Sequence, residues 1–63
     1  MGTSTYQIDV EETCFVVEVD NQTGLVTDAS PIAQWMIGRP YRDVKLWVEG
    51  KDGKMVFVRA TWL

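Results

Sequence analysis

Histidine is absent from this 63-residue sequence, and cysteine occurs once, as Cys14. A single cysteine cannot form an intrachain disulfide, and the usual Cys/His zinc sites need more ligands of these types. Without histidine, no Ser–His or Cys–His nucleophilic pair can exist. Cys14 has no basic neighbour in the sequence to lower its thiol pKa, so we expect it to be a core residue. We therefore predict a protein that is not an enzyme and that uses no metal or other cofactor.

Basic residues are missing from residues 1–30, which carry six acidic ones. Residues 31–63 hold all six lysines and arginines beside three acidic residues, and the net charge is −3. A negative net charge disfavours non-specific binding to nucleic acid. The segregation has two interpretations: the two halves attract each other within one fold, or the acidic half forms a surface for a basic partner.

Long apolar runs are also missing, and none approaches the ~20 residues of a membrane span. The first residues lack the basic and apolar segments of a secretory signal, so we expect a cytoplasmic protein without membrane contact. A lone free thiol fits that compartment. The length predicts a single domain over residues 1–63, with residues 1–4 flexible. A domain this small is marginal unless it packs well or self-associates.

Alternation of apolar and polar residues predicts the strands. Residues 6–10 alternate and form a strand or an extended arm, while residues 13–20 give the strongest strand of the chain. A turn that ends at Gly24, where a positive φ is expected, leads into a short strand over residues 25–29. These two strands predict a β-hairpin, and residues 55–62 predict a last strand.

Residues 30–40 form a short apolar segment with clear helix start and stop signals. The Ser30 hydroxyl can cap the first turn, a proline follows at the first helical position, and Gly38 can close the helix in the left-handed conformation. Gln34 is the one polar residue inside it. We therefore expect this helix to be covered nearly all round, between the sheet and the next helix.

A second helix is predicted over residues 41–49, with a core face of Tyr41, Val44, Trp47 and Val48. The expected fold class is α+β. Its small antiparallel sheet has three strands, or four if residues 6–10 form one, and two short helices pack on one face in the order (β)ββααβ.

The two faces of this sheet are predicted from strand alternation. The face under the helices is expected to carry Phe15, Val17, Val19, Val56, Val58 and Trp62. The other face is expected to carry Cys14, Val16, Met55 and Phe57, with Glu18 and Arg59 as a cross-strand pair. Two short helices cannot cover both faces, so either residues 6–10 fold over the second face or a second copy covers it. We predict a homodimer or higher oligomer through this second face.

Arg39, Arg42 and Lys45 recur at three-residue spacing along the outer side of the second helix, and Leu46 lies among them. A solvated face, a protein-binding face with Leu46 as an apolar anchor, and a phosphate-contacting stripe are the three interpretations. The interspersed acidic residues and the lack of interleaved aromatics argue against nucleic acid. With Trp62 as a second anchor, we predict that these five residues bind a partner.

The segment from Ala29 to Pro40 reads A-S-P-I-A-Q-W-M-I-G-R-P and is followed by Val44 and Trp47. It resembles small, mostly uncharacterised proteins of tailed phages and prophages, in which a strand hairpin precedes an A-P-I-x-x-W-x-x-G-K/R motif and a short helix with a tryptophan. The resemblance covers roughly residues 14–50. It implies an accessory protein that acts stoichiometrically on host or defence machinery in a bacterial cytoplasm, and it assigns no activity.

The leading hypothesis is a non-catalytic binding protein, a phage-encoded inhibitor or modulator of a host or defence protein in the manner of an anti-CRISPR. One alternative is a nucleic-acid-linked module, either an acidic DNA mimic or a weak DNA binder through Arg39, Arg42 and Lys45. Another alternative is an oligomer that binds or sequesters a small molecule in a tryptophan-lined cleft.

Overall fold

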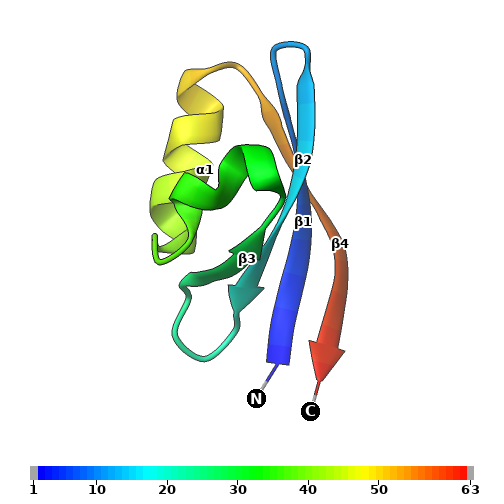
Figure 1. Ribbon diagram of the computed structural model, residues 1–63, viewed down its shortest axis with the longest axis vertical. Coiled ribbons are helices and arrows are strands. Elements are labelled where there is room, and N and C mark those ends of the chain that lie inside the picture. The colour runs from blue at the N-terminus through cyan, green and yellow to red at the C-terminus, as the bar shows by residue number, and fades with distance from the viewer. Residues whose placement is uncertain (1, 63) are drawn as a thin grey trace.

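A four-stranded antiparallel sheet carries the fold, with its strands in the order β3-β2-β1-β4. The computed structural model describes residues 2–62. Along the chain the elements are β1 (Gly2–Val10), β2 (Thr13–Asp20), β3 (Val26–Ala29), the 3-10 helix η1 (Pro31–Met36), α1 (Tyr41–Gly50) and β4 (Lys54–Trp62). Both η1 and α1 lie on one side of the sheet (Figure 1). The predicted α+β class, including the fourth strand, is confirmed.

The first strand is a central strand of the sheet rather than a loose arm. β1 pairs with β2 on one side and with β4 on the other over nearly its whole length. Residues 2–4, which we expected to be flexible, belong to it: Thr3 pairs with Asp20, and Ser4 pairs with Val19. The Ser4 hydroxyl also donates a hydrogen bond to Asn21 Oδ1 at 2.6 Å. Ile8 is fully buried because it lies in this central strand on the face that packs against the helices.

The hairpin between β2 and β3 forms as predicted. Asp20 Oδ1 accepts a hydrogen bond from the backbone N–H of Gln22 at 2.7 Å, and Gly24 takes a φ of 76°. An acidic residue that starts the turn and a glycine at positive φ are the features expected for such a connection. In the resulting register Glu18 lies opposite Asp28.

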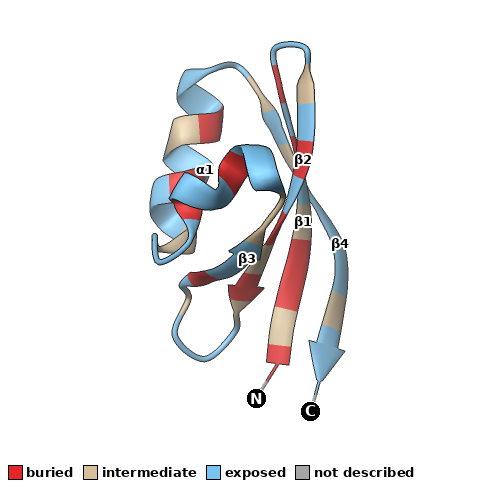
Figure 2. Cartoon of the chain, viewed as in Figure 1, coloured by how far each residue is buried: buried red, intermediate tan, exposed pale blue. Residues whose placement is uncertain are grey.

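The core forms where the covered face of the sheet meets the two helices (Figure 2). Its buried apolar side chains are Ile8, Val10, Phe15, Val17, Val19, Val26, Ala33, Met36, Val44 and Val48. β4 adds no fully buried side chain to this group, and Met55 packs against it while partly exposed. The core therefore centres on β1, β2 and the helical layer.

The predicted phase of β4 is wrong for residues 55–57, whereas Trp62 lies opposite Gly2 on the helical side, as predicted. Met55 lies opposite Ile8 and Phe57 opposite Tyr6, so Met55 and Phe57 face the helical side of the sheet. Val56 and Val58, predicted to be buried, are about half exposed, and Trp62 is 71% exposed. Because residues 55–58 are all apolar, alternation does not specify which of them face inward.

The predicted second face is therefore only half right. Cys14 and Val16 lie on the helix-free face of β2, which we call the open face, but Met55 and Phe57 do not share it. The expected Glu18–Arg59 pair is also separated, because β1 lies between their strands and each faces Thr5. No patch formed by all four predicted self-association residues exists among residues 2–62.

The first helix differs most from expectation. η1 is a 3-10 helix with a kink at Ala33, and the Ser30 side chain makes no capping bond. Ala33 and Met36 are its buried residues, so the expected coverage nearly all round is wrong. Gly38 does adopt the predicted left-handed conformation, with a φ of 90°. The helix thus presents much of its apolar surface to solvent.

Candidate functional site

The helical layer exposes large apolar side chains, of which those of the first helix were expected to be buried. In a 3-10 helix, residues three apart lie one above the other. Ala33 and Met36 accordingly point into the core, whereas Ile32 and Trp35 point outward and are more than half exposed. Leu46 of α1 is 61% exposed, as its place on the outer side of the helix predicted. Large exposed apolar groups gathered on one layer are typical of an interaction surface.

Two tryptophans join the two helical elements. Trp35 of η1 and Trp47 of α1 meet edge to face, with ring centroids 5.2 Å apart and an interplanar angle of 70°. Trp47 is partly buried, while Trp35 is 51% exposed. A pair in this geometry contributes ~0.5–1.5 kcal/mol beyond the burial of its area. The contact therefore holds Trp35 in place although half of its surface meets water.

A hollow of about 290 Å³ lies beside this pair. Its lining comprises Trp35, Arg39, Asp43, Val44, Leu46 and Trp47, and we call it the tryptophan hollow. A second hollow of about 270 Å³ borders the same two rings and is also lined by Ile32, Phe15 and Lys51. The tryptophan pair thus stands between two hollows on the outside of the helical layer.

The predicted partner-binding residues do not all come together. Arg39 and Leu46 both line the tryptophan hollow, whereas Arg42 and Lys45 are exposed on α1 without lining it. Trp62 lies at the end of β4 opposite Gly2 and borders a different hollow with Asn21 and Gln22. The sequence did not reveal Trp35 as a surface residue, because the apolar helix was expected to be covered, whereas Trp47 packs against the core as predicted.

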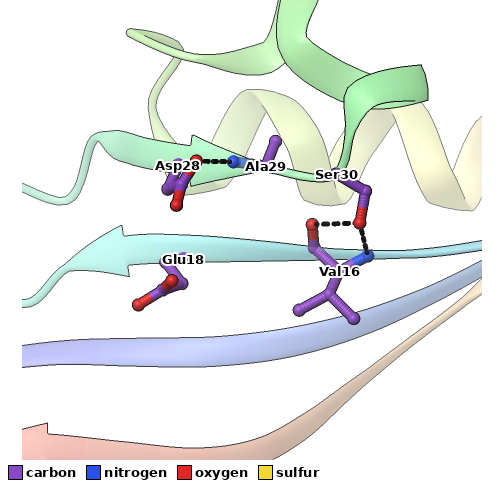
Figure 3. Close-up of a pocket in the computed structure, with 5 residues that line it drawn as sticks. All are labelled: Val16, Glu18, Asp28, Ala29 and Ser30. Carbon is purple, nitrogen blue, oxygen red and sulfur yellow. Dashed lines mark hydrogen bonds between the residues drawn. The ribbon is translucent and has the colours of Figure 1, made fainter.

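The open face carries a separate polar hollow at the junction of β2 and β3 (Figure 3). There the Ser30 hydroxyl accepts a hydrogen bond from the Val16 N–H at 3.1 Å and donates one to the Val16 carbonyl at 3.3 Å. Asp28 Oδ1 accepts a hydrogen bond from the Ala29 N–H at 2.9 Å. The two Ser30 bonds hold the end of β3 to β2, whereas the Asp28–Ala29 bond lies within β3. Within residues 2–62, no group of three or more acidic, cysteine or histidine side chains is placed to hold a metal ion.

Cys14 is exposed on the open face, and the expectation that it belongs to the core is wrong. Gln7 Nε2 donates a hydrogen bond to its sulfur at 3.3 Å. A hydrogen bond to the Asp9 carboxylate raises the pKa of the thiol above its ordinary value, with desolvation and the charge of Asp9 adding to the effect. The thiol is therefore protonated at neutral pH, and a protonated thiol is a poor nucleophile.

In the part of the chain that the structure describes, no helix is long and apolar enough to cross a membrane. Comparison with protein-family models, with curated proteins and with solved structures finds no match to this chain. Its function is therefore inferred from its surface.

Proposed function

We propose that this chain is a non-catalytic protein-binding module that receives an apolar side chain of its partner in the tryptophan hollow. The observation that carries the proposal is the half-exposed Trp35, which packs against Trp47 at the edge of a hollow shared with Leu46. Binding energy in protein interfaces concentrates in a few such residues, among which tryptophan and arginine are enriched.

The energetic argument is that Trp35 and Leu46 each leave more than half of their surface in water. Burial of apolar surface contributes roughly 25 cal/mol per Å², so covering both side chains supplies a few kcal/mol, of order 2–4. The Trp35–Trp47 contact lowers the ordering cost, because Trp35 is already held before a partner arrives. A preformed apolar hollow is thus a better binding site than an exposed flexible side chain.

The charges around the hollow define the partner's chemistry. Arg39 lines it, and Arg42 lies one helical turn before Leu46 on the exposed side of α1. Asp43 is the acidic residue among the lining side chains. We therefore infer a partner segment with an aromatic or large aliphatic anchor followed or preceded by acidic residues, because a basic rim favours acidic neighbours.

The proposed cellular role is stoichiometric modulation of that partner in the cytoplasm of a bacterial host. The similarity of residues 29–40 to a phage and prophage pattern supports this setting, as does an exposed free thiol. A module that acts by occupying a partner's surface needs no catalytic group.

A peptide-display selection tests the proposal. The full chain is immobilised and used to select from a random peptide library, and the enriched peptides are measured by fluorescence anisotropy. We expect enrichment of an apolar anchor beside acidic residues. Leu46→Gln is expected to weaken binding of those peptides by roughly tenfold, the loss that corresponds to about 1.4 kcal/mol.

Leu25→Gln is the matched control, because Leu25 is another exposed leucine and lies outside the tryptophan hollow. Arg39→Gln and Arg59→Gln form a second pair, of which the first is expected to weaken binding and the second is not. Selected peptides that bind Leu46→Gln and Arg39→Gln as tightly as the parent chain would contradict the proposal, and so would a selection without enrichment.

A second candidate function rests on the charges of the open face. The strand registers place Asp9, Glu18 and Asp28 on it, with Asp20 in line on β2, while the basic Lys54 and Arg59 lie on the same face along β4. An acidic DNA mimic would use this face to occupy a basic cleft. Competition between the chain and duplex DNA for a basic DNA-binding protein tests this candidate. Competition that persists in a variant with Asp9→Asn, Glu18→Gln, Asp20→Asn and Asp28→Asn would exclude the open face as its site.

A further inference from the structure

β4 forms one outer edge of the sheet and is long and apolar for such a strand. It spans Lys54–Trp62, and the sheet order leaves its outer backbone groups without a strand partner among residues 2–62. Val56, Phe57 and Val58 in its middle are each slightly more than half exposed. A long edge with apolar side chains on both faces is a template for pairing with another strand.

We propose that β4 pairs antiparallel with β4 of a second copy, across a two-fold axis that passes between Phe57 and Val58. The two sheets would then form one continuous sheet, with both helical layers on the same side. Closed two-fold symmetry is the commonest arrangement of homo-oligomers, and it brings identical patches together.

The register follows from the bulge in β4. Because the pairing with β1 shifts between Thr5 and Tyr6, Val56 and Arg59 both lie on the open face, whereas Met55 and Ala60 both lie on the helical side. A two-fold axis between Phe57 and Val58 sets Val56 opposite Arg59 of the second copy. It likewise sets Met55 opposite Ala60 of the second copy, so side chains of the same face meet. An axis through Phe57 or through Val58 would instead oppose residues of different faces.

The charges of β4 select this axis over its neighbour. Lys54 and Arg59 are its charged residues, and both are basic. Moving the axis by one residue toward the C-terminus would place Arg59 diagonally beside Arg59 of the second copy, and like charges so close are destabilising. With the axis between Phe57 and Val58, the apolar residues occupy the centre and Lys54 lies opposite Thr61 of the second copy at each end.

This arrangement would also add buried surface and hydrogen bonds to a small domain. Eight paired positions on each strand supply roughly eight inter-strand hydrogen bonds. The exposed halves of Phe57 and Val58 from both copies are covered together at the centre. Domains of this length have a limited core and are commonly stabilised by association. A second copy of β4 has the same length, and in this register its apolar centre meets the apolar centre of the first copy while the polar ends meet each other.

Charge reversal at the axis tests the proposal by sedimentation equilibrium of the full chain, at concentrations on the order of 1 to 300 μM. The parent chain is expected to dimerise. Val58→Lys and Val58→Glu should each weaken the dimer by at least about tenfold, because two like charges then meet near the axis. An equimolar mixture of the two variants should restore a dimer, since opposite charges face each other there.

Val16→Lys is the matched control, because it adds the same charge to an exposed valine of the open face. It should leave the dimer intact, and circular dichroism of each variant should show a folded chain. A parent chain that stays monomeric over the whole range overturns the proposal. It is also overturned if folded Val58→Lys and Val58→Glu fail to pair when mixed, or if Val16→Lys dissociates the dimer. The tryptophan hollow lies outside β4, so peptide binding and dimerisation can fail separately.

Discussion

The two edge strands of the sheet, β3 and β4, differ in length, in charge and in what covers them. β3 has four residues, and the chain turns away from it at once into η1 (Figure 1). Ser30 bonds to both backbone groups of Val16 where β3 ends, and the acidic Asp28 occupies the strand itself. β4 has nine residues, is apolar in its centre and carries no acidic side chain.

The difference shows that the chain protects the β3 edge more fully than the β4 edge. Short strands, charges and covering segments are the means by which proteins keep an edge from pairing with other chains. β3 combines all three, whereas β4 has a bulge and two basic residues. The proposed pairing of two β4 strands would therefore use the less protected of the two edges.

Replacing the methionine that packs near each edge by alanine should give the largest difference in the free energy of unfolding. Met36 anchors η1 over the β3 side and is fully buried, whereas Met55 of β4 is partly exposed. Met36→Ala is expected to lower the free energy of unfolding by about 2–5 kcal/mol. Since so small a domain rarely has more than ~3–5 kcal/mol in total, this variant should be largely unfolded.

Met55→Ala is expected to cost roughly 1 kcal/mol, within the range of ordinary point changes. Urea unfolding followed by tryptophan fluorescence measures both variants, with Met36→Leu as the conservative control. Equal losses for Met36→Ala and Met55→Ala would show that both edges depend on the core to the same degree.

The glycines that precede the two edge strands allow a second comparison. A Cβ at Gly53 would lie 2.5 Å from the Asp9 carbonyl oxygen and 2.7 Å from Val10 Cγ2, so β4 would have to move away from β1. Gly53→Asn is expected to cost about 1–3 kcal/mol, as overpacking does.

At Gly24, before β3, nothing lies within 4 Å of the added Cβ, although the φ of +76° is left-handed. Asparagine tolerates this conformation, so Gly24→Asn should change stability by no more than about 0.5 kcal/mol. Thermal unfolding of the two variants gives the comparison, and a Gly24→Asn loss as large as that of Gly53→Asn would refute it.

Local signals in the sequence sufficed for much of the fold. The hairpin, the positive φ at Gly24 and Gly38, and the α-helix from Tyr41 were predicted correctly. In each case the signal is local, because glycine permits a positive φ and the spacing of apolar residues indicates a helix. The buried pair Val44 and Val48 follows from helical spacing in the same way.

The candidate site was only partly predictable, because exposure depends on what lies opposite. Arg39 and Leu46 were predicted to be on the surface and they do meet at one hollow. Trp35 was expected to be buried, because the sequence does not show that η1 is a 3-10 helix with one side open. Because residues 55–58 are all apolar, the sequence does not show which of their side chains face the helices. The pairing register with β1 determines this.

The smallest effect is expected when the carboxylate next to the β4 edge, Asp9, is neutralised. Asp9 of β1 lies opposite Lys54 of β4 and opposite Cys14 of β2, and its hydrogen bond raises the pKa of the thiol. Asp9→Asn removes the negative charge and leaves a weaker acceptor. The pKa of Cys14 should therefore fall toward its ordinary value, and more thiolate should be present at neutral pH.

The rate of Cys14 alkylation by iodoacetamide, measured as a function of pH, checks this expectation. Asp28→Asn at the β3 edge is the matched control, because the same charge is removed from a carboxylate that bonds to the Ala29 N–H instead of the thiol. We expect the pH–rate curve of Asp9→Asn to shift to lower pH, while that of Asp28→Asn stays close to the parent curve. Coincident curves for all three proteins would mean that Asp9 does not raise the pKa of the Cys14 thiol. The charge of Asp9 would then affect this pKa no more than the charge of Asp28 at the β3 edge does.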